Sequence, residues 1–399
     1  MAKREQRRSR HKAERNEKIR KQKTQRAVAD FNVTPDNLHQ AMTTAVALHR
    51  ADQLAQAERI YRRVLALQPG HVDALSSLAM IEFRAKRYDH AVELLERVLA
   101  KAPDIPGFHM NLGAVLEGAG RTEEAAASYR LAIEIAPTYP DPYYNLGDLF
   151  LRQGRAADAV ELFDACMTAI GREFHALAYK AHALDDAGRH AEARYLLDFD
   201  TYVKSYAFEP PQGFDSIETF NAALARHIRT HPTLQGNVMS TEHGKHTAEL
   251  LREPKGPMAV MEQRIHEAIR WYIEQLPDDP RHPAVQWLPK AWKLTSWGVV
   301  MFDRGHERAH IHPNGWLSGV FYLSLPDLIA DPARNHEGWL EFGRPTSDLH
   351  VQADLTIRHY QPVYGQMFLF PSYFYHGTIP FRSNQRRICV AFDVEPLLH

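Results

Sequence analysis

A repeat of 34 residues runs through the first half of this 399-residue chain and limits the folds open to it. Three sets of residues keep this spacing: Ala57, Ala91, Ala125, Ala159 and Ala193; Pro69, Pro103 and Pro137; and Gly120-Arg121, Gly154-Arg155 and Gly188-Arg189. A unit of this length holds two helices and a turn, and it buries its apolar face only by stacking on the next unit. The period therefore predicts an α-solenoid of helical pairs.

Large and small side chains share the phase of this repeat. Leu112-Gly113 and Leu146-Gly147 lie where two helices approach closely, a place that only a small residue fits. The matching large positions are Tyr61, Leu95, Tyr129, Phe163 and Leu197. This combination resembles the tetratricopeptide repeat, in five units over residues 38–207. The first helix has no Trp at its usual aromatic position, and the fifth unit lacks the terminal Pro.

Asn111 and Asn145 occupy the same position in the first helices of consecutive units. Stacked helical pairs present a groove, and an Asn side chain both donates and accepts hydrogen bonds. The two asparagines are therefore predicted to hold an extended peptide by its backbone, as similar asparagines do in members of this repeat family. The alternative is that each Asn bonds a neighbouring helix. Cys166 follows the phase of a small core residue and is interpreted as packing.

The N-terminal 26 residues carry twelve Lys or Arg against three Glu, a net charge of +9 in a chain whose net charge is −1. Such a cluster contacts nucleic acid or a ribosome through phosphates, or it is a solvated tail. Aromatic residues that would stack on bases are not interleaved with the charges. We expect residues 1–37 to form a separate basic arm, disordered and then helical.

Other features of the composition exclude several classes of protein. No apolar run approaches the roughly 20 residues that cross a bilayer, and the N-terminus is too charged for a signal peptide, so we expect no membrane contact and a cytoplasmic location. The two cysteines, Cys166 and Cys389, argue against a disulfide scaffold or a Cys-rich zinc module.

The second half of the chain is built differently, because the repeat stops near Ala207 and all six Trp lie beyond it. Residues 216–230 and 258–276 have helical apolar spacing. From Trp292 onward the pattern changes to short apolar strands, VVMF, GVFYLSL, WLEF, HYQPVYG, QMFLF and RICVAFDV. We expect a domain over residues 208–399, with a helical lead-in at 208–291 and a jelly-roll core at 292–399. The fold class is thus multidomain α + β.

Three histidines and one arginine on these strands suggest chemistry. His310 and His312 are alternate residues of an extended segment and face the same way. His376 follows a strongly apolar strand, and Arg387 opens the last one. A guanidinium pointing into an apolar barrel needs an anionic partner, and a dicarboxylate cosubstrate supplies one with bidentate geometry.

Four motifs occur in order over residues 292–394: HIHPNGWLSGVFYLSLP, GWLEFGRP, GQMFLFPSYFYHGTIPF and RRICVAFDV. They resemble the 2-oxoglutarate/Fe(II) oxygenases of the prolyl-hydroxylase-like group. The resemblance implies that His310 and His376 bind iron and that Arg387 and Tyr322 hold the distal carboxylate of 2-oxoglutarate. Ser318 is placed nearby as a further cosubstrate contact. The cofactors implied are Fe(II), 2-oxoglutarate and O2.

One departure concerns the third ligand. The wider superfamily uses His-x-Asp/Glu, and here the aligned position is His312, which gives three imidazoles in place of two imidazoles and a carboxylate. We expect His312 to be the third ligand, and no catalytic residue beyond the ligands is predicted. Asp303 and Glu307 are the carboxylates close enough in sequence to intrude.

The sequence therefore suggests a dioxygenase that hydroxylates a protein or peptide captured by the repeats and releases succinate and CO2. Three alternatives stay open at this point. The chain would be a non-catalytic repeat scaffold with a metal-binding barrel, an oxygenase that acts on nucleic acid recruited by the basic arm, or an oxygenase that acts on a small molecule.

Overall fold

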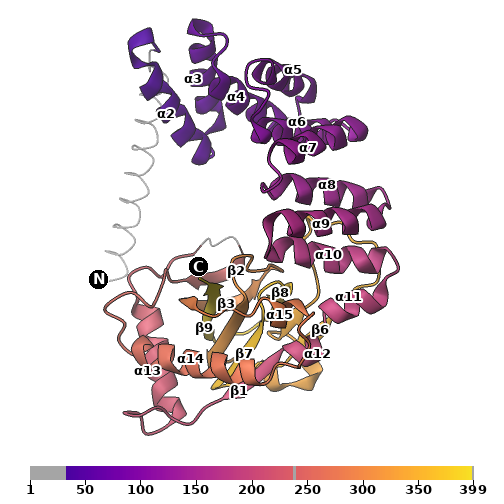
Figure 1. The fold of residues 1–399 in the computed structure, drawn as a ribbon. Coiled ribbons are helices and arrows are strands. Elements are labelled where there is room, and N and C mark those ends of the chain that lie inside the picture. Colours follow the sequence, from indigo (N-terminus) through magenta and orange to yellow (C-terminus); the bar gives the residue numbers. More distant parts are fainter. Residues whose placement is uncertain (1–32, 237–239, 398–399) are drawn as a thin grey trace, which may run out of the picture. The chain divides into compact units, whose positions relative to one another are not determined.

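The computed structural model describes residues 33–236 and 240–397 (Figure 1). The chain divides into two compact units, with the boundary between Leu146 and Gly147. The basic cluster of the expected N-terminal arm lies outside the described residues. Among the described residues, no helix combines the length and the apolar character needed to cross a membrane.

The first unit consists of antiparallel helical pairs. Its helices are α2 (Leu38–Arg50), α3 (Leu54–Leu67), α4 (Val72–Arg84), α5 (Tyr88–Leu99), α6 (Pro106–Gly118) and α7 (Thr122–Ile135). The repeated alanines Ala57, Ala91 and Ala125 are fully buried between helices. A Cβ atom on Gly113 would lie 2.5 Å from Cε1 of Tyr129. The predicted pairing of a small residue on one helix with a large residue on the next is therefore observed.

The helical pairs continue into the second unit. Helix α8 (Asp141–Arg152) crosses the boundary and is followed by α9 (Ala156–Ile170), α10 (Phe174–Asp186), α11 (His190–Leu196) and α12 (Phe199–Tyr202). Gly188 connects α10 to α11 with a φ of +74°, a left-handed conformation that favours glycine. Cys166 is fully buried on α9, and burial raises the pKa of its thiol to about 12, in keeping with a packing role.

The remainder of the second unit is rich in sheet. A six-stranded antiparallel sheet has the order β1-β7-β4-β9-β3-β2, with strands β1 (Lys204–Ala207), β7 (Gln366–Pro371), β4 (Leu317–Ser324), β9 (Arg387–Pro396), β3 (Trp292–Glu307) and β2 (Thr241–His246). A three-stranded antiparallel sheet has the order β6-β5-β8, with β6 (Arg358–Tyr360), β5 (Leu340–Phe342) and β8 (His376–Thr378). The predicted apolar segments form most of these strands.

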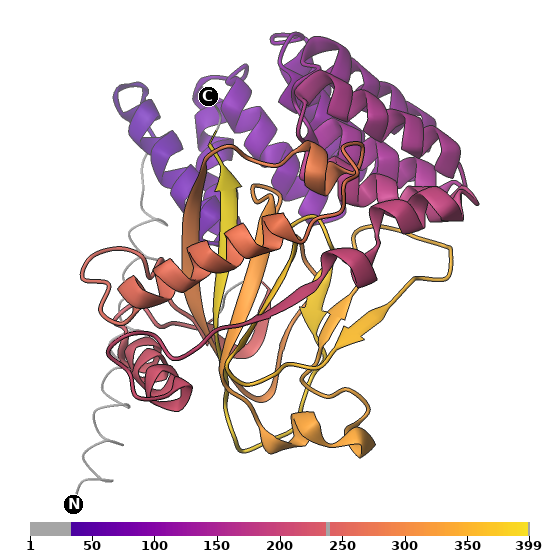
Figure 2. The same cartoon turned by 60° about the horizontal axis from the view of Figure 1, so that its bottom comes forward.

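Helices cover the larger sheet. The lead-in contributes α13 (Ile217–Thr230), α14 (Met258–Glu274) and the short α15 (Pro283–Gln286), and Figure 2 shows α14 running across the strands. Ile228 of α13 packs directly on Gly298 of β3, where a Cβ atom would come within 2.6 Å. The lead-in also contains the edge strand β2, which its charged sequence TEHGKH did not predict. This strand matters because it supplies residues to the site below.

The register of the sheet sets which side chains share a face. Strand β9 lies between β3 and β4, with Arg387 opposite Met301 and Asp393 opposite Ser318. Alternate residues of a strand point to the same side, so Arg387, Cys389 and Asp393 are presented together. The strand thus displays a cation at one end and a carboxylate six residues further along.

Candidate metal centre

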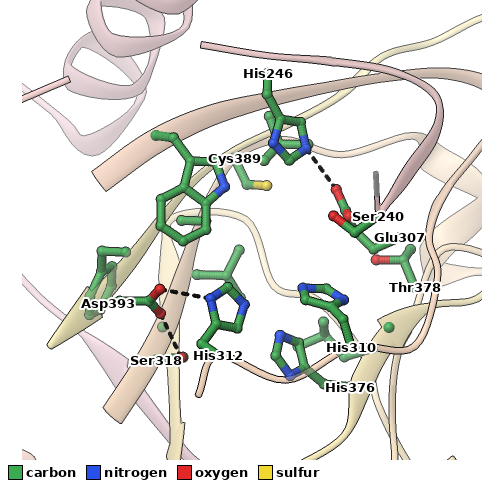
Figure 3. Close-up of a pocket in the computed structure, with 18 of the residues that line it drawn as sticks. Ser240, His246, Glu307, His310, His312, Ser318, His376, Thr378, Cys389 and Asp393 are labelled. Atoms are coloured by element: carbon green, nitrogen blue, oxygen red, sulfur yellow. Dashed lines mark hydrogen bonds and ion pairs between the residues drawn. The ribbon is translucent and has the colours of Figure 1, made fainter. Parts of the chain in front are cut away.

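Three histidines converge beside the sheet (Figure 3). His310 and His312 lie just after β3, and His376 begins β8. An antiparallel bridge joins His310 to His376 through two backbone hydrogen bonds of 3.0 Å, and the His312 N–H donates to the Ser372 carbonyl at 3.0 Å. One nitrogen from each ring lies within 4.8 Å of the others. The predicted ligands are therefore brought together.

A hydrogen bond orients each of the three rings. His310 Nδ1 lies 2.7 Å from the Arg308 carbonyl oxygen, and His376 Nδ1 lies 2.9 Å from that of Phe374. His312 Nδ1 lies 2.7 Å from Asp393 Oδ2. Carbonyl and carboxylate oxygens only accept, so each Nδ1 carries the hydrogen and each Nε2 keeps its lone pair. This is the arrangement that prepares an imidazole to bind a metal.

The environment also favours neutral rings at two of the three positions. Burial lowers the pKa of His376 well below its usual value, and the neighbouring histidines lower it further. Burial likewise lowers the pKa of His310. For His312 burial acts in the same direction, but the charge of Asp393 and its hydrogen bond prevail and raise the pKa.

Asp393 was not singled out from the sequence, which carries no local signal for it. Its second oxygen accepts a 2.7 Å hydrogen bond from Ser318, whose hydroxyl also lies 2.8 Å from that of Ser372. The predicted cosubstrate contact Ser318 thus lies at the site, with its hydroxyl engaged behind His312. The network fixes the carboxylate that in turn orients the His312 ring.

Arg387 is 2% exposed and has no carboxylate partner among the described residues. Its guanidinium donates to the Tyr322 hydroxyl at 3.2 Å and lies 4.9 Å from the centre of that ring. The other near groups are the sulfur atoms of Met301 and Cys389, and Nε has no hydrogen-bond partner in the part of the chain that the structure describes. A buried cation left without a counter-ion is costly, so this side chain fits an anionic ligand.

A cavity of about 330 Å³ joins the histidines to Arg387. One part of its wall is apolar, with Trp297, Val299, Leu340 and Phe370, and another part is polar, with Ser240, His246, Glu307 and Thr378. A space of this size is at the lower end of small-molecule sites in proteins. The geometry of the cavity therefore suits a small anion held next to a metal.

Glu307 is the second carboxylate of the cavity wall, and it is half-buried. It accepts hydrogen bonds from Thr241 at 2.6 Å and from His246 at 2.9 Å. Burial raises the pKa of Glu307, but these bonds and the nearby histidines outweigh it and lower the pKa to about 2. Asp303 is instead exposed and accepts from the Ser383 N–H at 3.1 Å. Neither carboxylate belongs to the cluster of three histidines.

The predicted peptide-binding asparagines lie in the first unit, Asn111 on α6 and Asn145 on α8. Both are half-buried. Within residues 33–236 and 240–397, neither side-chain amide makes a hydrogen bond, so the alternative in which each bonds a neighbouring helix is not observed. Both amides keep their hydrogen-bonding capacity for a ligand.

Comparison with known protein families agrees with this architecture. Residues 295–393 match a family model described as "Putative 2OG-Fe(II) oxygenase". Residues 48–110, 118–154 and 140–170 match tetratricopeptide repeat models. The chain therefore carries N-terminal tetratricopeptide repeats and a C-terminal domain of the 2OG-Fe(II) oxygenase type. A search of curated proteins finds no match.

Solved structures similar to this chain include those of the protein MamA. One crystal structure of MamA is 20% identical, with a TM-score of 0.36, and the match covers 40% of this chain and 87% of that one. MamA from Desulfovibrio magneticus RS-1 is 23% identical, with a TM-score of 0.32, and the match covers 34% and 76% of the two chains. Nothing about function follows at this level of similarity.

Proposed function

We propose that the chain is an Fe(II)- and 2-oxoglutarate-dependent dioxygenase. It hydroxylates a protein or peptide captured by the repeats and releases succinate and CO2. We further propose that the two sheets form the double-stranded β-helix, or jelly-roll, of such enzymes. Bound iron, 2-oxoglutarate and O2 would supply the oxidising chemistry, and the chain's own residues bind, orient and exclude water.

The observation that carries this proposal is the presence in one cavity of three inward-facing imidazoles and an uncompensated arginine. His310, His312 and His376 would hold the metal through Nε2. Arg387 would bind the distal carboxylate of the cosubstrate, and the Tyr322 hydroxyl, which accepts from Arg387, keeps its own hydrogen to donate to the same carboxylate.

Where the wider superfamily has a carboxylate ligand, this chain has His312, and a carboxylate lies behind this histidine instead. Three neutral imidazoles leave a divalent metal with no charge compensation from its ligands. Asp393 contributes a negative charge directly behind His312, at 2.7 Å from its Nδ1. We propose that this hydrogen bond makes His312 a more basic ligand and so replaces part of what a bound carboxylate provides.

The repeats are the proposed capture site for the substrate. Asn111 and Asn145 occupy the same position in consecutive repeats, and their side-chain amides make no hydrogen bond to another described residue. Such an arrangement suits a peptide backbone. The non-catalytic alternative is disfavoured because all three histidines and Arg387 are present. Contact of the basic arm with nucleic acid or a ribosome involves residues 1–26, which are not described, and it has no support from the comparisons.

Anaerobic binding of 2-oxoglutarate to the full chain, with Fe(II) added, tests the arginine assignment. Arg387→Ala should weaken cosubstrate binding by at least about 30-fold, because truncating one partner of a buried charge pair costs about 2–5 kcal/mol. The matched control is Arg386→Ala, since Arg386 is exposed and directly precedes Arg387 in the chain. Equal affinities for the two variants would contradict the assignment.

A further inference from the structure

The segment that connects β5 to β6 lies against the repeats of the second unit. Asp148 on α8 accepts a hydrogen bond from the backbone N–H of His350 at 2.9 Å. Asp186 on α10 accepts from the backbone N–H groups of Gln352 at 2.9 Å and Ala353 at 2.6 Å. Two carboxylates, one from each of two consecutive repeats, thus hold three backbone amides of a distant segment.

These contacts recognise backbone more than side chains. The N–H groups of residues 350 and 352 are two apart and point to the same side of an extended chain. The chain bends at Ala353, which turns a third N–H towards Asp186. The side chains add a 3.0 Å contact of His350 Nδ1 with Asp148, and a 3.2 Å hydrogen bond from Gln352 to the Leu151 carbonyl. A groove that binds extended peptides uses this kind of contact.

The segment is anchored by polar contacts and little else. Among residues 344–357, Leu349 is the one buried side chain, and the others are exposed or half-exposed. Hydrogen bonds near solvent with few apolar contacts open at low free-energy cost. The segment can therefore leave its place without unfolding the sheets.

The helices involved are the first helices of the fourth and fifth repeats. Asp148 follows Asn145 by three residues on α8, so both project from the same side of that helix. This is the side on which the sequence predicts peptide binding. The chain's own residues 349–353 thus occupy part of the face expected to receive a peptide.

We propose that Asp148 and Asp186 form a binding site for extended peptide backbone, and that residues 349–353 fill it as a tethered ligand. An outside peptide with free backbone N–H groups reaches the site by displacing them. Tethering gives the segment an effective concentration in the millimolar range, so it excludes weak binders. The inference rests on peptide capture by the repeats, one part of the proposed function, and does not depend on the iron chemistry.

The test uses a fluorescent synthetic peptide with the sequence of residues 346–355, TSDLHVQADL. In the full chain, the double variant Gln352→Pro/Ala353→Pro removes the two backbone N–H groups that donate to Asp186. The segment is thereby released from Asp186. This released variant should bind the peptide at least tenfold more tightly than the wild type. Adding Asp186→Asn should remove the gain, whereas adding Asp158→Asn, an exposed carboxylate on α9, should not.

The proposal is overturned if the released variant binds the peptide no more tightly than the wild type. It is also overturned if the tighter binding persists after Asp186→Asn is added. Either result would mean that the contact only holds the segment in place. Hydrogen exchange gives a second measurement that does not need the proline variant to fold. In Asp148→Asn/Asp186→Asn, the amides of residues 350, 352 and 353 should exchange at least tenfold faster, with β4 and β9 unchanged. Unchanged exchange at those three amides also overturns it. Equal 2-oxoglutarate affinities of Arg387→Ala and Arg386→Ala, which would contradict the oxygenase proposal, would leave both of these results intact.

Discussion

At the scale of single residues, the site depends on side chains that orient the histidines through hydrogen bonds as well as on the histidines themselves. The three histidines could be found from sequence because they fall in ordered motifs, and Arg387 because a cation in an apolar strand is unusual. Asp393 could not, since an Asp near the end of a strand has no distinctive pattern and its role arises from the pairing of β4 with β9. Glu307 could be named from the sequence as a nearby carboxylate, but its partners Thr241 and His246 could not, because they come from an unpredicted strand.

The first prediction concerns Asp393. Asp393→Asn should weaken Fe(II) binding by about 10–100-fold, because loss of an outer carboxylate lowers the basicity of His312 and frees its ring. Competition titration against a metal indicator under nitrogen measures this. Asp303→Asn, which changes an exposed carboxylate on the neighbouring strand β3, is the control. Affinity equal to the control's would show that the carboxylate does not support the metal.

The second prediction concerns His182 on α10, which is 2% exposed and packs on the ring of Tyr375, next to the ligand His376. Burial lowers its pKa to about 4. The unfolded chain, with a His pKa near 6.5, then binds more protons between these values, so stability falls as the pH drops from about 6.5 towards 4. This histidine should cost the fold about 2 kcal/mol between pH 7.5 and 5.

Urea unfolding followed by tryptophan fluorescence checks this, because all six Trp lie in the second unit. The loss of stability on acidification should be about 2 kcal/mol smaller in His182→Leu, which has a similar volume and no titrating group. An equally steep loss in the variant would mean that other groups control the acid sensitivity.

At the scale of helices and strands, the repeats were the most predictable part of the chain. Each unit repeats its packing within 34 residues, so the local pattern contains most of the information on which faces meet. The sheets were less predictable, because pairing between β3, β9 and β4 joins segments far apart in sequence. Strand β2 was missed because its sequence lacks an apolar alternation.

The third prediction tests the packing between helices. Gly147→Ala should destabilise the fold by about 1–3 kcal/mol, since its Cβ would lie 2.2 Å from Cζ of Phe163 in a close-packed contact. Gly107→Ala is the matched control, because no atom of the described residues lies within 4 Å of its Cβ position. The control should be neutral or stabilising by less than about 1 kcal/mol. Urea unfolding followed by circular dichroism compares them, and a neutral Gly147→Ala would show that the helices separate easily.

At the scale of the whole molecule, the second unit joins repeat helices to the metal centre. The segment before His376 packs on the last repeats, with the Tyr373 hydroxyl donating to the Leu196 carbonyl at 2.6 Å and the Phe374 ring 4.8 Å from that of Phe199. The sequence pattern placed a limit between repeats and oxygenase near residue 207. The second compact unit begins at Gly147, so it includes the last repeat helices together with the sheets. Such contacts between sequence-distant segments have no local signal.

The measurement that tests the central claim most directly is succinate formation by the anaerobically purified full chain given Fe(II), 2-oxoglutarate and O2. Slow, iron-dependent succinate formation is expected for the wild type without added peptide. His376→Ala and Arg387→Ala should abolish it, and Arg386→Ala should retain it. Succinate formed equally by all four proteins, or a wild type that binds neither Fe(II) nor 2-oxoglutarate, would contradict the assignment of this cavity as an oxygenase site.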